Sequence, residues 1–235
     1  GPHLLTLLSV SFQPKCTLAH ITAKQVSIRS DSKPANVPHL HRVRRIDNMT
    51  IQHVVDKPSR AALFLVLEIK DGGEQATRDM LTGFAGLFKS VNFRYNEGEL
   101  YTVVGIGASM WPRLTSAPMP ERLKEFEAID AAHKAPATPG DILLHFRANT
   151  YDLCHEMARQ VLDQLGDAAR VIDETHGFKY LDQRDLLGFV DGTANPLAEE
   201  ALDTVLLGDD ADYPRGSYVT CLLYTSPSPR DLSTS

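Results

Sequence analysis

Two helix patterns, each enclosed by two strand-like apolar runs, constrain the fold of this chain more than any other feature of its sequence. Residues 61–69 are apolar almost throughout, which is typical of a strand covered on both faces or nearly so. Apolar residues at spacings of three and four over residues 74–91 predict a helix with one buried face. Residues 101–106 then predict the next strand.

The same order returns later in the chain. Residues 141–147 predict a third strand, and Asn149 or Thr150 can cap the helix that follows it. Gly166 marks the end of that helix, and residues 169–174 predict a fourth strand. The buried stripe of the helix consists of Leu153, Met157, Val161, Leu162 and Leu165.

A long connection between residues 113 and 140 separates the two halves of this pattern. It contains prolines at positions 118, 120, 136 and 139. Prolines at that density indicate an irregular excursion rather than a second domain. A short helical piece is predicted around residues 121–128.

The order strand, helix, strand, excursion, strand, helix, strand predicts an α+β fold. It is the split β-α-β arrangement of a ferredoxin-like domain, with a four-stranded antiparallel sheet and both helices on one face. The other face is free to carry a ligand or to pair with a second sheet. Because ferredoxin-like domains host many functions, the fold alone indicates none of them.

Charge is distributed unevenly along the chain. The formal net charge is −6, but the first 48 residues contain seven Lys or Arg against two Asp or Glu, so the middle of the chain is acidic. An acidic domain argues against nucleic acid as the partner, since contacts to phosphates require a basic surface. No apolar run reaches the roughly eighteen residues of a membrane span, so none is expected.

Cysteine use favours a reduced, intracellular environment only weakly, and on this basis we expect a cytoplasmic protein. Of Cys16, Cys154 and Cys221, only Cys154 lies in the well-patterned middle, and a single cysteine cannot cross-link a fold. Its place in a helical pattern indicates a small buried residue rather than a nucleophile.

The two ends of the chain lack the patterns of the middle. Residues 1–48 precede the first methionine, Met49, and we interpret them as a disordered, non-native upstream extension; the alternative is a basic arm or a targeting peptide. Residues 221–235 resemble the translation of a sequencing adapter; the alternative is a Ser/Pro-rich disordered tail. Residues 49–184 are predicted to form the folded domain.

Residues 185–196 read D-L-L-G-F-V-D-G-T-A-N-P and carry the strongest functional signal in the chain. Asp191 follows an apolar run and lies between Gly188 and Gly192, where the backbone can turn sharply and approach a flat ligand closely. The pattern therefore indicates a carboxylate that faces a cavity. A lone Asp-Gly pair would indicate only a turn, but the length of this motif favours a binding site.

The motif resembles the G-x-x-D-G signature of the dye-decolourising haem peroxidases. Further stretches agree with the bacterial branch of that family, at residues 104–107, 133–143, 177–182 and 216–219. The resemblance implies two ferredoxin-like domains per chain. Residues 49–184 would be the first domain, and residues 185–220 would be the distal haem loop and the start of a truncated second domain.

The resemblance also implies a haem b cofactor and a catalytic role for Asp191 as the distal acid–base residue. The haem-binding residues that it implies are Gly188, Phe189, Val190, Asp191, Gly192 and Thr193. The implied substrates are hydrogen peroxide and a small organic reductant of dye-like, phenolic or porphyrin type. The implied assembly is a homo-oligomer, which some relatives package in a protein compartment.

Two groups that the family uses do not occur at matching positions. The distal arginine and the histidine that ligates the haem iron would follow residue 219, so no metal ligand is assigned and this chain by itself is expected to be inactive. Four histidines precede the motif, and each is expected to be a surface or packing residue: His133, His145, His155 and His176. The alternative function is a non-catalytic ferredoxin-like module that dimerises or binds a small ligand.

Overall fold

The computed structural model describes residues 18–19, 52–56, 58–128, 130, 137–182, 184, 188, 190, 196, 198–208, 213 and 216–219. Most of the predicted domain therefore lies within the described residues. Of residues 185–196, which carry the motif, the structure describes Gly188, Val190 and Pro196.

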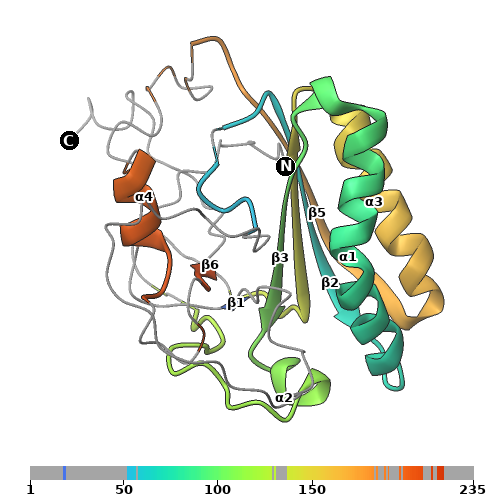
Figure 1. Ribbon diagram of the computed structural model, residues 1–235. Coiled ribbons are helices and arrows are strands. Elements are labelled where there is room, and N and C mark those ends of the chain that lie inside the picture. The colour runs from blue at the N-terminus through green and yellow to red at the C-terminus, as the bar shows by residue number, and fades with distance from the viewer. Residues whose placement is uncertain are drawn as a thin grey trace, which may run out of the picture.

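The two strand–helix–strand patterns form as predicted. The first consists of β2 (Ala61–Ile69), α1 (Glu74–Arg94) and β3 (Tyr101–Gly107), and the second of β4 (Ile142–Ala148), α3 (Tyr151–Leu165) and β5 (Ala169–Phe178). These four strands are antiparallel and lie in the order β5-β2-β4-β3. Figure 1 shows α1 and α3 together on one side of the sheet. The α+β, ferredoxin-like prediction is confirmed.

Alternation along the strands divides their side chains between the two faces of the sheet. Leu63, Leu65 and Leu67 of β2 are buried in the core that α1 and α3 complete. The centre of that core is fully enclosed, with Phe146 of β4 and Met157 of α3 both 0% exposed. Burial of this apolar face against two amphipathic helices is the main stabilising interaction of the fold.

Two details of the long connection differ from the prediction. Residues 121–128 form a turn followed by irregular chain, so the helical piece predicted there is wrong. Only Leu123 of that stretch is buried, and so short a helix has little stability without an apolar face to bury. A four-residue helix, α2 (Trp111–Leu114), forms instead before this stretch, with Pro112 in its first turn and Trp111 only 2% exposed.

Shorter elements complete the described structure. Helix α4 (Ala198–Val205) and the two-residue strands β1 (Leu18–Ala19) and β6 (Tyr218–Val219) are added to the core domain, together with the 3-10 turns Asn96–Gly98 and Gly166–Ala168. Strand β1 pairs with β3 and with β6, which extends the sheet to six strands. In Figure 1, α4 lies across the sheet from α1 and α3. The rest of residues 1–48 and all of residues 221–235 lie outside the described residues.

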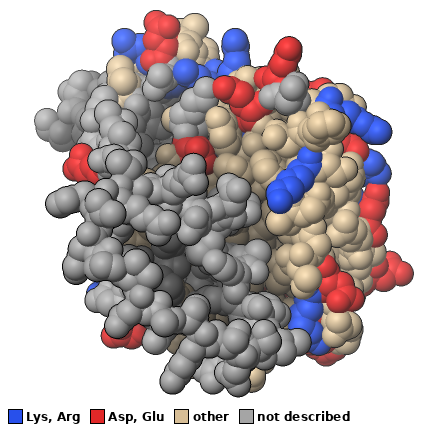
Figure 2. All heavy atoms as spheres, viewed as in Figure 1, with Lys and Arg blue, Asp and Glu red and all other residues tan. Residues whose placement is uncertain are grey.

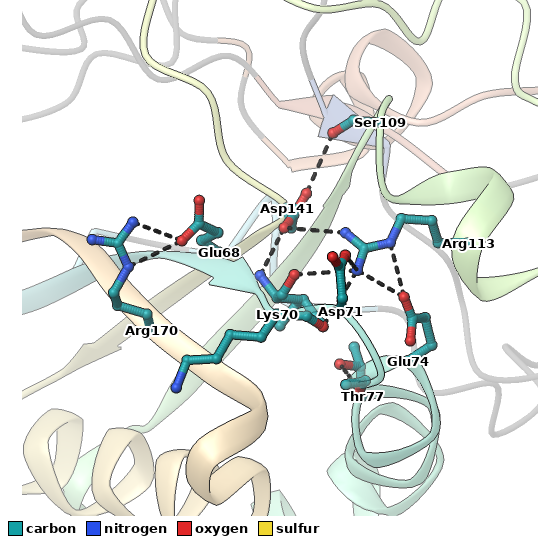
Figure 3. Close-up of polar contacts among 11 residues, drawn as sticks. Glu68, Lys70, Asp71, Glu74, Thr77, Ser109, Arg113, Asp141 and Arg170 are labelled. Atoms are coloured by element: carbon teal, nitrogen blue, oxygen red, sulfur yellow. Dashed lines mark hydrogen bonds and ion pairs between the residues drawn. The ribbon is translucent and has the colours of Figure 1, made fainter.

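A network of hydrogen bonds and ion pairs stabilises the end of the sheet next to α2 (Figure 3). Asp141, only 9% exposed, accepts hydrogen bonds from the Ile69 N–H at 2.7 Å and from the Ser109 hydroxyl at 3.3 Å. Arg113 of α2 donates to Glu74 at 2.7 Å and lies 3.8 Å from the Asp141 carboxylate. These contacts satisfy backbone and charged groups where β2, β4 and α1 meet, so we assign this network a structural role.

Candidate active site

The structure places two of the six predicted haem-binding residues. Gly188 has a φ of +94°, in the region where glycine is favoured, and Val190 is 48% exposed. Phe189, Asp191, Gly192 and Thr193 lie outside the described residues. The proposed catalytic carboxylate therefore remains a prediction from the sequence, and of the eight residues before it the structure describes Arg184, Gly188 and Val190.

This loop begins at the end of β5 and folds back on itself around Arg184. The Arg184 N–H donates to the Tyr180 carbonyl at 3.1 Å, and Arg184 forms antiparallel bridges with Tyr180 and with Val190. Its guanidinium Nη1 donates to the Gly188 carbonyl at 2.8 Å. The sequence gives no signal for these contacts, because they depend on the path of the backbone. We call Tyr180, Arg184, Gly188 and Val190 the Arg184 loop.

The described part of the Arg184 loop fits a flat apolar ligand in two respects. Among the described residues, the chain neighbours of Gly188 aside, no heavy atom lies within 4 Å of the position that a Cβ would occupy on Gly188. Val190 adds an exposed apolar side chain beside it. Among the described residues, no cluster of three or more His, Cys, Asp or Glu side chains could hold a metal ion.

A second feature of interest is a histidine on the sheet face away from α1 and α3. His145 of β4 stacks on Phe64 of β2, with ring centroids 3.9 Å apart and planes 18° from parallel. Its Nε2 atom is buried and has no hydrogen-bond partner within the described part of the chain. His145 is thus a packing residue, as expected. Burial and, secondarily, the charge of Arg147 lower its pKa to about 3, so the ring is neutral near pH 7.

Residues 52–56 lie against the edge of β3 and contact Arg147 of β4. The Arg147 guanidinium donates to the Asp56 carbonyl at 3.0 Å and to the His53 carbonyl, and lies 5.6 Å from the centre of the Tyr101 ring. The Gln52 amide bonds to both the N–H and the carbonyl of Val104, at 2.5 and 3.4 Å. The Gln52 side chain therefore uses backbone hydrogen-bonding groups at the edge of β3 that a neighbouring strand would otherwise pair with.

Because His145 is neutral in the folded chain, we expect the stability of the fold to depend on pH. In the unfolded chain, histidine binds a proton below about pH 6.5, whereas the folded chain holds His145 uncharged down to a pKa of about 3. The unfolded state therefore binds more protons in this window, and stability is lost as pH falls from 6.5 towards 3. Between pH 6.5 and 4, His145 should lower the free energy of unfolding by on the order of 3 kcal/mol.

Urea unfolding of the His145→Phe variant, which keeps a ring against Phe64, checks this prediction. The variant should lose less stability than the wild type between pH 6.5 and 4. The control is His155→Phe, at an exposed position on α3, which should follow the wild-type pH dependence. If wild type and His145→Phe lose stability in parallel, His145 is not the group responsible.

The other predicted packing and surface residues are placed as follows. His155 and His176 are exposed, and His176 contacts the Tyr151 hydroxyl at 2.9 Å and Glu174 at 2.6 Å. Cys154 of α3 is 0% exposed, and burial raises the pKa of its thiol to about 12, which suits packing and not nucleophilic chemistry. His133 lies outside the described residues.

The described surface is mixed in charge. Figure 2 shows Lys and Arg side chains next to Asp and Glu side chains, without a uniformly basic area on the described part of that face. Exposed ion pairs join Arg170 to Glu68 and Arg159 to Asp163, each at 2.6 Å. In the part of the chain that the structure describes, no helix is both long and apolar enough to cross a membrane.

Comparison with known proteins gives a consistent result over both halves of the chain. The sequence model described as "Dyp-type peroxidase, N-terminal" matches residues 52–179. The model described as "Dyp-type peroxidase, C-terminal" matches residues 182–226. The two matches are separated only by residues 180 and 181, at the start of the Arg184 loop and ten residues before Asp191.

Similar proteins agree with these matches. A protein of Brevibacterium linens named "Dye-decolorizing peroxidase" is 49% identical over 178 residues, which are 75% of this chain and 48% of that protein. Among solved structures, DyPB from Rhodococcus jostii is 46% identical with a TM-score of 0.66, over 68% of this chain and 53% of that one. A variant of the same protein, solved in complex with haem, gives a TM-score of 0.65.

A further solved structure is described as the encapsulated DyP-type peroxidase from Mycobacterium smegmatis. It is 43% identical with a TM-score of 0.61, over 63% of this chain and 48% of that one. The chain thus spans about half the length of the relatives that it matches.

Proposed function

Because the chain belongs to the Dyp-type peroxidase family, we propose that the whole protein is a haem-dependent peroxidase that uses hydrogen peroxide to oxidise dye-like, phenolic or porphyrin-type reductants. The observation that carries this proposal is the junction of the two family matches at the Arg184 loop. The motif at residues 185–196 overlaps this loop at Gly188 and Val190. Among the described residues, chain neighbours aside, no heavy atom lies within 4 Å of a Cβ position on Gly188, which is compatible with a ligand there.

The proposed cofactor is haem b, held by the loop residues Gly188, Phe189, Val190, Asp191, Gly192 and Thr193. When bound, haem supplies the iron at which peroxide is reduced and the oxidising equivalents that a reductant then removes. Haem complexes of similar proteins support this assignment. The apolar Val190 and the unhindered backbone at Gly188 are compatible with a flat macrocycle.

Asp191 has the proposed role of acid–base residue. Its carboxylate takes a proton from one oxygen of hydrogen peroxide and returns it to the other oxygen as the O–O bond breaks, so that the departing oxygen leaves as water. An aspartate has an ordinary pKa of about 3.9, and partial burial beside a porphyrin would raise that pKa. A group that both accepts and returns a proton works best near its own pKa. The reaction should therefore be fastest in acidic solution.

The proposed function predicts peroxide-dependent bleaching of an anthraquinone dye by the haem-loaded full-length protein, fastest at acidic pH. Steady-state rates from pH 3 to 8 check this. The protein without haem is the control and should bleach no dye. Full haem occupancy without bleaching at any pH would support the alternative, a ferredoxin-like module that binds a small ligand or dimerises.

The partners and the cellular location are also proposals. We propose a homo-oligomer, supported by β5, which pairs only with β2 among the described residues. Packaging in a protein compartment is supported by the relative from Mycobacterium smegmatis, and the cytoplasm is the location that suits such packaging. The mixed surface charge supports neither nucleic acid nor a membrane surface as a partner.

A further inference from the structure

At Thr102 and Val104, two residues from another segment close the outer edge of β3. The Thr102 N–H donates to Nδ1 of His53 at 3.2 Å, and the His53 N–H donates to the Thr102 carbonyl at 3.3 Å. The Gln52 amide bonds to the N–H and to the carbonyl of Val104. Gln52 and His53 thus satisfy all four backbone groups that Thr102 and Val104 direct away from β4.

The His53 ring lies among groups from several elements. It packs against Phe88 of α1 and Tyr101 of β3, with ring centroids 4.9 and 5.5 Å away. Arg147 of β4 donates to the backbone carbonyls of His53 and Asp56. The charges that act on the ring are those of the Arg147 guanidinium and the Asp56 carboxylate.

Nδ1 of His53 accepts a hydrogen bond only while the ring is neutral. A backbone N–H always donates, so the bond from Thr102 requires an unprotonated Nδ1 and places the ring proton on Nε2. In the imidazolium both ring nitrogens carry protons, and the Nδ1 proton then faces the Thr102 N–H.

The surroundings of His53 keep the ring neutral at ordinary pH. Burial lowers its pKa below the usual 6.5, and it outweighs the Asp56 charge and the Thr102 backbone, which raise the pKa. The charge of Arg147 lowers the pKa further. The bond from Thr102 to Nδ1 is therefore complete at neutral pH and is lost as the pH falls through the lowered pKa.

We infer that Gln52 and His53 form an acid-released latch, which closes the edge of β3 at neutral pH and frees it when His53 is protonated. Three of the four bonds at this edge use side-chain atoms, so one ionisation weakens the attachment while the pairing of β3 with β4 remains. Release exposes backbone groups of Thr102 and Val104 with which another strand can pair. Neither latch residue belongs to the proposed haem loop, so the latch is independent of the proposed function.

Hydrogen exchange of the full-length protein tests the latch, read at single residues at about pH 7.5 and about pH 4.5. After correction for the intrinsic pH dependence of exchange, the amides of Thr102 and Val104 should lose protection roughly five- to tenfold in acid, as expected for the loss of one hydrogen bond. Val103, whose backbone pairs with His145 of β4, is the internal reference. It reports any loss of global stability over the same range, and the loss at Thr102 should exceed it.

Three variants separate the titration of His53 from its packing. His53→Asn places a carboxamide oxygen at the position of Nδ1, which accepts a hydrogen bond but does not titrate, so Thr102 should stay protected relative to Val103 at both pH values. His53→Ala lacks the acceptor and should show low protection of Thr102 at both. The matched control is His155→Asn, at an exposed position of α3, which should follow the wild type.

Three results would overturn the inference. One is wild-type protection at Thr102 that changes with pH only as much as protection at Val103. Another is an equal acid-dependent loss in wild type and His53→Asn, which would exclude protonation of His53 as its cause. The third is wild-type protection of Thr102 in His53→Ala, which would show that the ring does not hold the edge.

Discussion

Replacing Asp191 by Asn in the haem-loaded full-length protein should slow its reaction with hydrogen peroxide by roughly 10²- to 10⁴-fold. Asparagine has almost the same shape as aspartate but cannot accept a proton and return it. The variant should therefore still bind haem and peroxide, while cleavage of the O–O bond loses its acid–base group. Stopped-flow absorbance in the haem band, under a large excess of peroxide, measures this rate directly.

The matched control for this variant is Asp173→Asn, which makes the same change at an exposed position of β5. It should react as wild type. That result would show that the slow reaction of Asp191→Asn comes from the loss of the acid–base group and not from the loss of one negative charge. The pH dependence gives a second comparison, since the dependence that titration of Asp191 produces in the wild type should be absent from Asp191→Asn. Equal rates for wild type and Asp191→Asn would remove Asp191 from the mechanism.

The Phe146→Ala variant should lose about 3–5 kcal/mol of stability. Phe146 is 0% exposed at the centre of β4, and its ring lies 6.4 Å from the ring of Phe84 on α1. Truncation leaves a cavity between the sheet and the helices that neighbouring side chains cannot fill. Since domains of this size are stable by roughly 5–15 kcal/mol, the variant should be close to unfolding. Urea unfolding followed by circular dichroism measures the difference.

Phe93→Ala provides the control for this truncation. Phe93 is 89% exposed near the end of α1, so the same change of side chain removes no buried contact there and should alter stability by less than about 0.5 kcal/mol. A loss of similar size in both variants would show that an effect on the unfolded state, and not the core, accounts for it. That result would contradict the placement of Phe146 between the sheet and the helices.

The regular part of the fold could be predicted because the spacing of apolar residues along the sequence indicates which positions are buried. In α3, Leu153, Met157 and Val161 recur on one face, and all three are buried as predicted. The stretch at residues 121–128 was predicted wrongly because a few helix-favouring residues resemble a helix when the surrounding contacts are unknown. Helix α2 was missed although Pro112 in its first turn was a usable signal.

The candidate site could be predicted only in part. The glycines around Asp191 indicate a sharp turn and a close approach of the backbone to a ligand. The φ of Gly188 agrees with the turn, and the approach to a ligand stays a prediction. Arg184 could not be identified, because an exposed arginine in a loop has no periodicity and its acceptor is a backbone carbonyl four residues away. The face of His145 follows from strand alternation, but its stacking on Phe64 depends on the pairing of β2 with β4.

Titration of the full-length protein with haem, followed by one equivalent of hydrogen peroxide, tests whether this chain supplies the distal loop of a haem peroxidase. We predict binding of one haem per chain and an immediate change of the haem absorbance spectrum on addition of peroxide, reversed when a phenolic reductant is added. Absence of haem binding, or a bound haem whose spectrum does not respond to peroxide, would contradict the account.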